Sequence, residues 1–280
     1  MSAITDGLLK ILFDYNNFYT VSMVVWNKLT GLSVNLLTQN PTKGKYENVW
    51  NTVTDLYDSL SAIAGLLIVI FFMYGFLRDS SDIHAEYSLD TVFKLFIRLI
   101  ICGNIVGMSM PFIKKIIGWS ISLTKIVSGD FSIISGFGNG VDMIKQLKKA
   151  GFDGSLVLFL FGILFLIFTV LCGGLILFTV LNRIFRLYMI SPFAAVALST
   201  LVAGGNVANT GYSYIKAFLG YAFSAVMIAV ALTLAPAYIK IITLNSDNGF
   251  VIFLEYCLRM CTVTAAVKGT DILMTKALGL

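Results

Sequence analysis

The side chains that could do chemistry are few in this chain. The one histidine, His84, lies in a stretch rich in carboxylates that contains Asp79, Asp82, Glu86 and Asp90. A lone imidazole among carboxylates can sense pH or help to hold a cation, but an exposed loop has the same composition and is the better interpretation. A single histidine also excludes a zinc-protease pair and a multi-histidine metal site. This stretch predicts no catalytic centre.

Other reactive patterns are equally weak. No G-x-x-x-x-G-K-[ST] sequence is present, so we expect no nucleotide bound through a P-loop. Residues 136–140 (GFGNG) resemble a phosphate-binding loop only superficially, because they follow no predicted strand. Cys257 and Cys261 lie one helical turn apart in an apolar run, where free cysteines pack as small apolar residues. We therefore expect a protein that is not an enzyme and that holds no cofactor or metal.

Charges inside apolar runs are the remaining candidates, because they are costly in a bilayer. Lys94 and Arg98 are four residues apart and share one helix face, where they could line an aqueous path, face a partner or extend to the interface. The opposite charges at 255 and 259 have the same spacing and predict an intrahelical ion pair. Arg183 and Arg186 are predicted to mark a helix end at the lipid headgroups.

The composition explains why charges are so scarce. Of 280 residues, 58% are apolar and 12% charged, whereas a soluble domain carries about 25% charged residues. The mean hydropathy is +0.86. This excludes an ordinary cytosolic enzyme, a disordered chain and a secreted disulfide scaffold, and it predicts a multi-pass membrane protein. The net charge of +5 suits contact with anionic headgroups.

A transmembrane helix needs about 20 mostly apolar residues. Three runs meet this requirement clearly and three others less well: 59–77, 154–182 and 217–239, then 89–110, 187–203 and 250–267. The fold class is therefore all-α, with five or six transmembrane helices. The first ten residues lack the pattern of a signal peptide, so insertion is expected to use an internal segment.

Amphipathic segments complete the predicted organisation. Residues 111–127 form a helix that lies at the bilayer surface, with Lys114, Lys115 and Lys125 as interfacial charges and Trp119 as a headgroup anchor. The predicted regions are 1–50 (amphipathic), 51–110 (two transmembrane helices), 111–153 (interfacial helix and central loop) and 154–280 (a core of three to four helices and a tail). Positions that favour close helix packing or a helix break are Gly103, Gly107, Pro192 and Gly220.

The basic residues do not settle the orientation in the membrane. The region 111–153 carries six lysines, which favours the cytoplasmic side. Arg183 and Arg186 would lie in a short connection on the opposite side if 154–182 spans once. The topology stays open on this evidence.

Several segments together carry a family resemblance. Residues 183–205 (RIFRLYMISPFAAVALSTLVAGG) combine a basic helix end, a proline in a small-residue core and a glycine break. Residues 211–229 (GYSYIKAFLGYAFSAVMIA) begin the next span, and FKLFIRLIICGNIVG occupies the second span. The chain resembles the TrbL-like polytopic family of type IV secretion systems, in the form found in Gram-positive conjugative elements. The resemblance covers most of the chain, and its motifs consist of a hydrophobic pattern with a few Pro, Gly and Lys positions.

The resemblance implies a non-enzymatic subunit of the bacterial cytoplasmic membrane that helps to form the passage for relaxase-bound single-stranded DNA. It implies ring-like homo-oligomers in contact with membrane lipid, a secretion ATPase, a lytic-transglycosylase or stalk component and a bitopic scaffold. It also places the N-terminus and the central loop outside the cell. The candidate contacts to the channel, a partner or the DNA backbone are Lys94, Arg98, Arg183, Arg186 and Lys216. The alternatives are a small-solute transporter or channel, and a purely scaffolding membrane subunit.

Overall fold

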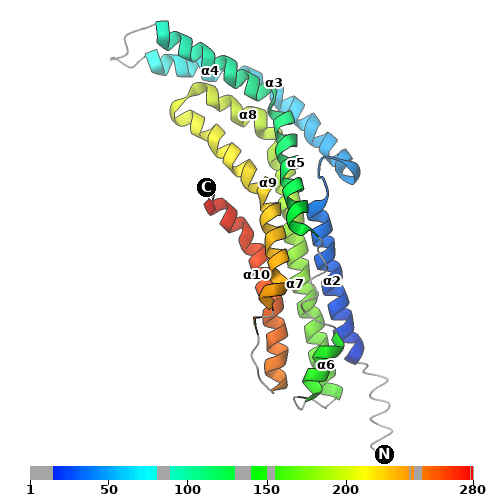
Figure 1. The fold of residues 1–280 in the computed structure, drawn as a ribbon. Coiled ribbons are helices and arrows are strands. Elements are labelled where there is room, and N and C mark those ends of the chain that lie inside the picture. The colour runs from blue at the N-terminus through cyan, green and yellow to red at the C-terminus, as the bar shows by residue number, and fades with distance from the viewer. Residues whose placement is uncertain are drawn as a thin grey trace, which may run out of the picture. The chain divides into compact units, whose positions relative to one another are not determined.

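The computed structural model describes residues 15–80, 89–129, 140–149, 155–239, 241–242, 248–277 and 279. All regular elements in these ranges are helices, which confirms the all-α prediction (Figure 1). The elements are α2 (Tyr15–Thr38), η1 (Gly44–Tyr46), α3 (Glu47–Ser80), α4 (Leu89–Gly107), α5 (Ser109–Ser128), α6 (Gly140–Lys149), α7 (Ser155–Ile190), η3 (Ser191–Phe193), α8 (Ala194–Ser199), η4 (Thr200–Ala203), α9 (Gly205–Ile239) and α10 (Gly249–Ala277). His84 and residues 136–139 lie outside the described residues.

The chain is a multi-pass membrane protein. In the described part, four stretches are long and apolar enough to cross a bilayer: Gly44–Arg78, Leu156–Ala203, Gly205–Ile239 and Gly249–Met274. A fifth span forms if the bent pair Val92–Gly107 and Ser109–Ser128 counts as one. The count of four or five overlaps the lower end of the predicted five or six.

The predicted separate span at 187–203 is wrong. Helix α7 continues without a break through Arg183 and Arg186 to Ile190, so these arginines lie inside a helix and not in a connection between two spans. The sequence from 175 to 190 contains neither proline nor glycine, and arginine is a good helix former. The break comes at Pro192, which starts the short run η3, α8 and η4.

One compact unit comprises residues 1–38, 124–181 and 226–270. In it, α2 buries one face with a repeat of three to four residues that includes Tyr19, Met23, Trp26 and Leu37. The Tyr19 hydroxyl donates a hydrogen bond of 3.1 Å to the carbonyl of Leu158 on α7. Residues 15–38 of the predicted N-terminal amphipathic region 1–50 thus form a packed helix, and α6 also packs against it, whereas residues 47–50 already belong to α3.

Helices α7 and α10 contact each other in the same unit through aromatic rings and small polar groups. The rings of Phe161 and Phe253 lie 4.9 Å apart, edge to face. Thr169 donates to the sulfur of Met260 at 3.5 Å and Thr264 to the carbonyl of Cys172 at 3.4 Å. The hydroxyls also bond to carbonyls of their own helices, so no hydroxyl here is unsatisfied.

The second compact unit comprises residues 39–123, 182–225 and 271–280. The short helix α8 and its flanking turns pack against α3 and α4. Close approach is possible because Gly75 on α3 faces the carbonyl of Ala203, where a Cβ would lie 2.8 Å from the oxygen. The turn before α3 is fastened to α7, because the Tyr188 hydroxyl donates a 2.8 Å hydrogen bond to the carbonyl of Pro41.

Helices α4 and α5 meet at a bend of 60°. Pro111 has no N–H, so the carbonyl of Gly107 lacks its helical partner four residues later. The Ser109 hydroxyl donates to the carbonyl of Val106 at 2.8 Å. The Tyr57 hydroxyl lies 2.8 Å from the Ser109 hydroxyl and 3.3 Å from the same carbonyl, so it can donate to either, and this group of contacts stabilises the bend. The sequence predicted this helix end near Pro111, within a few residues of the break.

Helix α5 has apolar side chains on two faces. Ile113, Ile117 and Ile121 are buried, whereas Phe112 and Trp119 are 50% and 59% exposed. Phe112 and the buried isoleucines therefore lie on different faces of α5. The role of the exposed Trp119 as a headgroup anchor stays a prediction.

Candidate functional site

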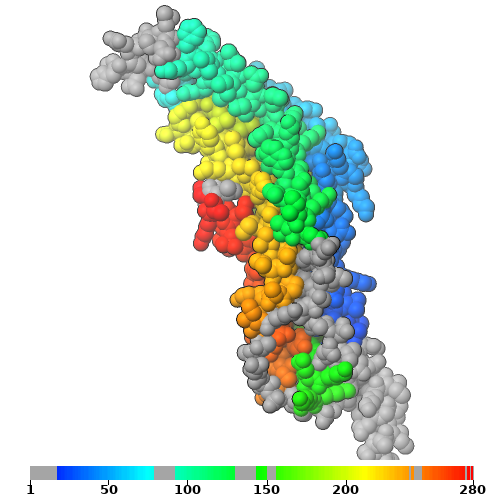
Figure 2. All heavy atoms as spheres, in the orientation of Figure 1, coloured from blue at the N-terminus to red at the C-terminus, as the bar shows by residue number. Residues whose placement is uncertain are grey.

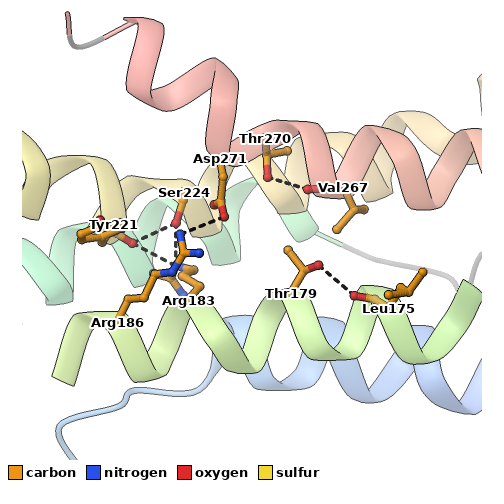
Figure 3. Close-up of polar contacts among 9 residues, drawn as sticks. All are labelled: Leu175, Thr179, Arg183, Arg186, Tyr221, Ser224, Val267, Thr270 and Asp271. Carbon is orange, nitrogen blue, oxygen red and sulfur yellow. Dashed lines mark hydrogen bonds and ion pairs between the residues drawn. The ribbon is translucent and has the colours of Figure 1, made fainter. Parts of the chain in front are cut away.

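The most elaborate polar cluster centres on Arg183, whose residue surface is only 7% exposed. Its Nε donates to the backbone carbonyl of Tyr221 and to the hydroxyl of Ser224, both at 3.1 Å (Figure 3). Its Nη2 donates to the carbonyl of Ala222 at 2.8 Å. The guanidinium on α7 therefore bonds to one turn of α9.

Small residues on α9 make this approach possible. Gly220, Ala222, Ser224 and Ala225 are all buried and leave the backbone carbonyls within reach of the long arginine side chain. The Ser120 hydroxyl on α5 also donates to the carbonyl of Ala222. A charge taken out of water is stable only when such hydrogen bonds replace its hydration. The cluster thus binds α5 and α7 to the same carbonyl of α9.

Arg186 lies one turn further along α7 and is much more exposed. Its Nη1 is 3.3 Å from the Asp271 carboxylate on α10, and the two side chains are 43% and 34% exposed. Its guanidinium lies 5.9 Å from the ring centre of Tyr221. Asp271 also attracts the charge of Arg183. Elements α7, α9 and α10 therefore share one polar network, with the charges on α7 and α10 and the carbonyls, hydroxyl and aromatic ring on α9.

This cluster holds neighbouring helices together through hydrogen bonds and an ion pair. It contains no nucleophile paired with a base. The part of the chain that the structure describes has no group of three or more His, Cys, Asp or Glu side chains arranged to hold a metal. The predicted intrahelical pair is confirmed: Arg259 and Glu255 form an ion pair, and Arg259 Nε also donates to the carbonyl of Ile242 at 3.0 Å. Arginines in this chain thus repeatedly bind backbone carbonyls.

The structure separates the predicted contact residues into two kinds. Arg183 is interior, so it does not present a charge at the surface, and its expected contact with the DNA backbone is not supported by its position. Lys94, Arg186 and Lys216 are exposed. Arg98 is half-buried and lies on the turn between η4 and α9.

The predicted packing residues also differ in what surrounds them. Pro192 and Gly220 are buried. A Cβ at Gly103 or Gly107 would meet no atom within 4 Å in the described structure, so these two glycines make no close helix contact there. Atoms of α4, which carries both, form part of the surface seen in Figure 2.

The predicted interfacial residues lie on exposed positions of α5. Lys114, Lys115, Trp119 and Lys125 are all exposed. The Lys114 ammonium lies 5.9 Å from the ring centre of Trp50, a buried residue at the start of α3. This contact joins the basic side of α5 to α3.

Sequence reasoning missed the partners of Arg183. The one available signal was the spacing of the small residues Gly220, Ser224 and Ala225, which indicated helix packing but not a buried cation. No family model matches this chain, and neither a curated protein nor a solved structure is significantly similar to it.

Proposed function

We propose that this chain is an integral cytoplasmic-membrane subunit of a type IV secretion or conjugation machine. It would contribute to the channel, or to its base, through which relaxase-bound single-stranded DNA is transferred. The proposal is supported by the resemblance of residues 183–205 and 211–229 to the TrbL-like family and by the multi-pass helical fold. It assigns the chain no catalytic step.

One observation carries the proposal further than the fold class does. The two segments with the strongest resemblance contact each other, because Arg183 in the first donates to the carbonyls of Tyr221 and Ala222 in the second. The Tyr214 hydroxyl of the second segment also donates to the carbonyl of Ile190 in the first, at 3.0 Å. The quoted motifs are thus parts of one packed element.

In this proposal the exposed basic residues serve the translocated strand or acidic partner surfaces. A passage for DNA of any sequence needs contacts to phosphate, and these carry no sequence information. Lys94 and Lys216 are exposed lysines with that chemistry. Arg183 acts by positioning α9 and makes no contact with DNA.

The exposed apolar side chains of α3 would face lipid, and α4 would also face neighbouring copies of the chain. Only 11% of the most apolar stretch of α3 is buried. Gly103 and Gly107 on α4 have open space around them and would allow a helix of another copy to approach closely. A ring-like homo-oligomer, joined by a secretion ATPase and a bitopic scaffold, is the proposed assembly.

The test is an in-frame deletion in the native element, with transfer to recipients scored beside donor growth. Loss of transfer with normal growth, restored by a wild-type copy in trans, is the expected result. Complementation with Lys94→Gln/Lys216→Gln at normal protein level should restore transfer poorly, whereas the matched Lys43→Gln/Lys45→Gln copy should restore it fully. Unchanged transfer after deletion would reject the secretion role.

A small-solute transporter or channel is the second candidate. The helix break from Ser191 to Ala203 and the 60° bend between α4 and α5 are irregularities of the kind found around transporter sites. Normal transfer together with altered solute uptake in the deletion strain would favour this function. Full transfer activity in the lysine variants, with loss of partner subunits in the deletion strain, would favour a purely scaffolding subunit.

A further inference from the structure

Two arginines from different helices lie on the same pair of glycines in the second compact unit. Arg78 is in the last turn of α3 and Arg98 is in α4, and both lie on the turn formed by Gly204 and Gly205. A Cβ built on Gly204 would lie 3.0 Å from the guanidinium carbon of Arg98, and one built on Gly205 would lie 3.0 Å from that of Arg78. The two guanidinium groups are therefore neighbours across the turn.

The backbone at this turn adds to the positive charge. Gly204 and Gly205 have φ values of +66° and +53°, which favour glycine, and Gly205 begins the 35-residue helix α9. The N–H groups in the first turn of a helix have no partner inside it, and the helix dipole places partial positive charge there. Two guanidinium groups and a helix N-terminus thus meet at one place.

A second observation indicates that a negatively charged group belongs here. Arg98 Nη1 is buried, and it has no hydrogen-bond partner in the described part of the chain. A buried guanidinium N–H without an acceptor is costly. An anion beside Arg98 would supply that acceptor, and phosphate matches the planar fork of arginine donors.

The surroundings favour a phosphate that carries acyl chains. Arg78 ends the apolar stretch Gly44–Arg78, where a headgroup is expected. Tyr74 and Leu77, in the turn before it, are 49% and 59% exposed. On α4, Ile97 and Ile101 beside Arg98 are 52% and 53% exposed. Exposed apolar side chains next to a cationic site provide a surface for hydrocarbon.

We propose that Arg78 and Arg98, together with the Gly204–Gly205 turn, form a binding site for the phosphate of an anionic phospholipid. The lipid tails lie on the exposed apolar side chains of α3 and α4. The site is separate from the Arg183 cluster and does not depend on the secretion role. The negatively charged stretch 79–90 of the same chain is the competing source of counter-charge.

The experiment is native mass spectrometry of the purified full chain in detergent, with phosphatidylglycerol, phosphatidylcholine or inorganic phosphate added. We expect phosphatidylglycerol to bind in preference to phosphatidylcholine, and a large excess of inorganic phosphate to leave it bound. Arg78→Gln/Arg98→Gln should lower the affinity for phosphatidylglycerol about tenfold to thirtyfold. The matched Lys43→Gln/Lys45→Gln variant removes the same charge from the turn before α3 and should bind like the wild type.

Three results would overturn the proposal. The first is a wild-type chain without preference for phosphatidylglycerol, and the second is a double arginine variant that retains the preference. The third is displacement by inorganic phosphate at equal concentration, which would indicate a site for free anions. If the double variant does not fold, the wild type is measured at low and high salt. A preference for phosphatidylglycerol that persists unchanged at high salt would then reject the arginine site.

The competing source of counter-charge has its own test. Asp82→Asn/Glu86→Gln reduces the negative charge of the stretch 79–90. Under the proposal, the wild type already binds phosphatidylglycerol and this variant binds it at least as well. Binding that appears only in the variant would show that the chain neutralises its own arginines, and it would reject the lipid site.

Discussion

Nη2 of Arg183 lies 2.8 Å from the backbone carbonyl oxygen of Ala222, on a helix that begins 22 residues after Arg183. Backbone carbonyls and the Ser224 hydroxyl, in place of water, surround this buried cation. A neutral side chain at position 183 would leave these acceptors with fewer donors and would loosen the contact between α7 and α9.

Arg183→Met should therefore lower the free energy of unfolding by about 2–4 kcal/mol, because a buried charged donor is removed from three acceptors. Arg186→Met is the matched control, since its ion pair with Asp271 is exposed and worth about 1 kcal/mol or less. Thermal unfolding in mild detergent, followed by tryptophan fluorescence, compares the two. Equal losses would contradict the assigned role of Arg183.

Gly205→Ala should destabilise the protein by about 1–3 kcal/mol. Alanine is strained at a φ of +53°, and its Cβ would overlap the Arg78 guanidinium. Gly103→Ala is the control, because this glycine is helical and has open space around it, so alanine should be neutral or stabilising by about 1 kcal/mol. The same unfolding assay compares the two variants. An unchanged stability of Gly205→Ala would contradict the assigned strain at this turn.

Tyr57→Phe should lower stability by about 1 kcal/mol, because the bend between α4 and α5 loses a hydroxyl that binds both Val106 and Ser109. Tyr74→Phe, at a position that is 49% exposed, should have no measurable effect. Hydrogen exchange at residues 104–112 would show whether the loss is local. Unchanged exchange there would contradict the role of Tyr57.

The Tyr19 hydroxyl predicts a dependence on alkaline pH. Burial raises the pKa of Tyr19 above the usual value of about 10, so the folded chain keeps this proton at a pH where the unfolded chain loses it. The contribution of the Tyr19 hydroxyl to the free energy of unfolding should thus be fully present below about pH 10 and should be lost as the pH rises further.

Tyr19→Phe separates this effect from the titration of other groups. The variant should be about 1 kcal/mol less stable at neutral pH, because the bond to Leu158 is lost. The difference between the two proteins should shrink above about pH 10, since phenylalanine does not titrate. If the free energies of unfolding of the two proteins changed in parallel over the alkaline pH range, Tyr19 could not be a buried, protonated group.

Gly107→Leu tests the proposed contact between copies of the chain. Because a Cβ at this position would have no neighbouring atom within 4 Å in the described chain, the monomer should keep its stability. The assembly should shift to smaller species in size-exclusion chromatography with light scattering. Gly65→Leu, also in open space but on α3, is the control that should leave the assembly intact.

Much of the fold follows from the sequence because apolar length is a strong signal for a membrane helix. The stretches around 59–77, 217–239 and 250–267 all lie within helices of spanning length, and Pro111 and Pro192 lie at the two main breaks. The end of α7 could not be placed this way. Charged residues at 183 and 186 resemble a helix end at the headgroups, but they are as compatible with a continuous helix.

The candidate site was less predictable, for a physical reason. The acceptors of Arg183 are mostly backbone carbonyls. Every residue has a backbone carbonyl, so the sequence does not show which ones accept a hydrogen bond. The glycines of the turn at 204 and 205 were recognisable as a break, yet nothing in the sequence shows that Arg78 and Arg98 lie on them. Such contacts join helices far apart in the chain and depend on tertiary packing.

The hydrogen bond from Tyr188 to Pro41 has a consequence for biosynthesis, because its partners are 147 residues apart. A ribosome adds about 5–20 residues per second, so Pro41 emerges about 7–30 s before Tyr188 can reach it. During that interval the Pro41 carbonyl, in the turn before α3, must accept from another donor, such as water at the membrane surface. This turn therefore reaches its final partner only after α7 has been made.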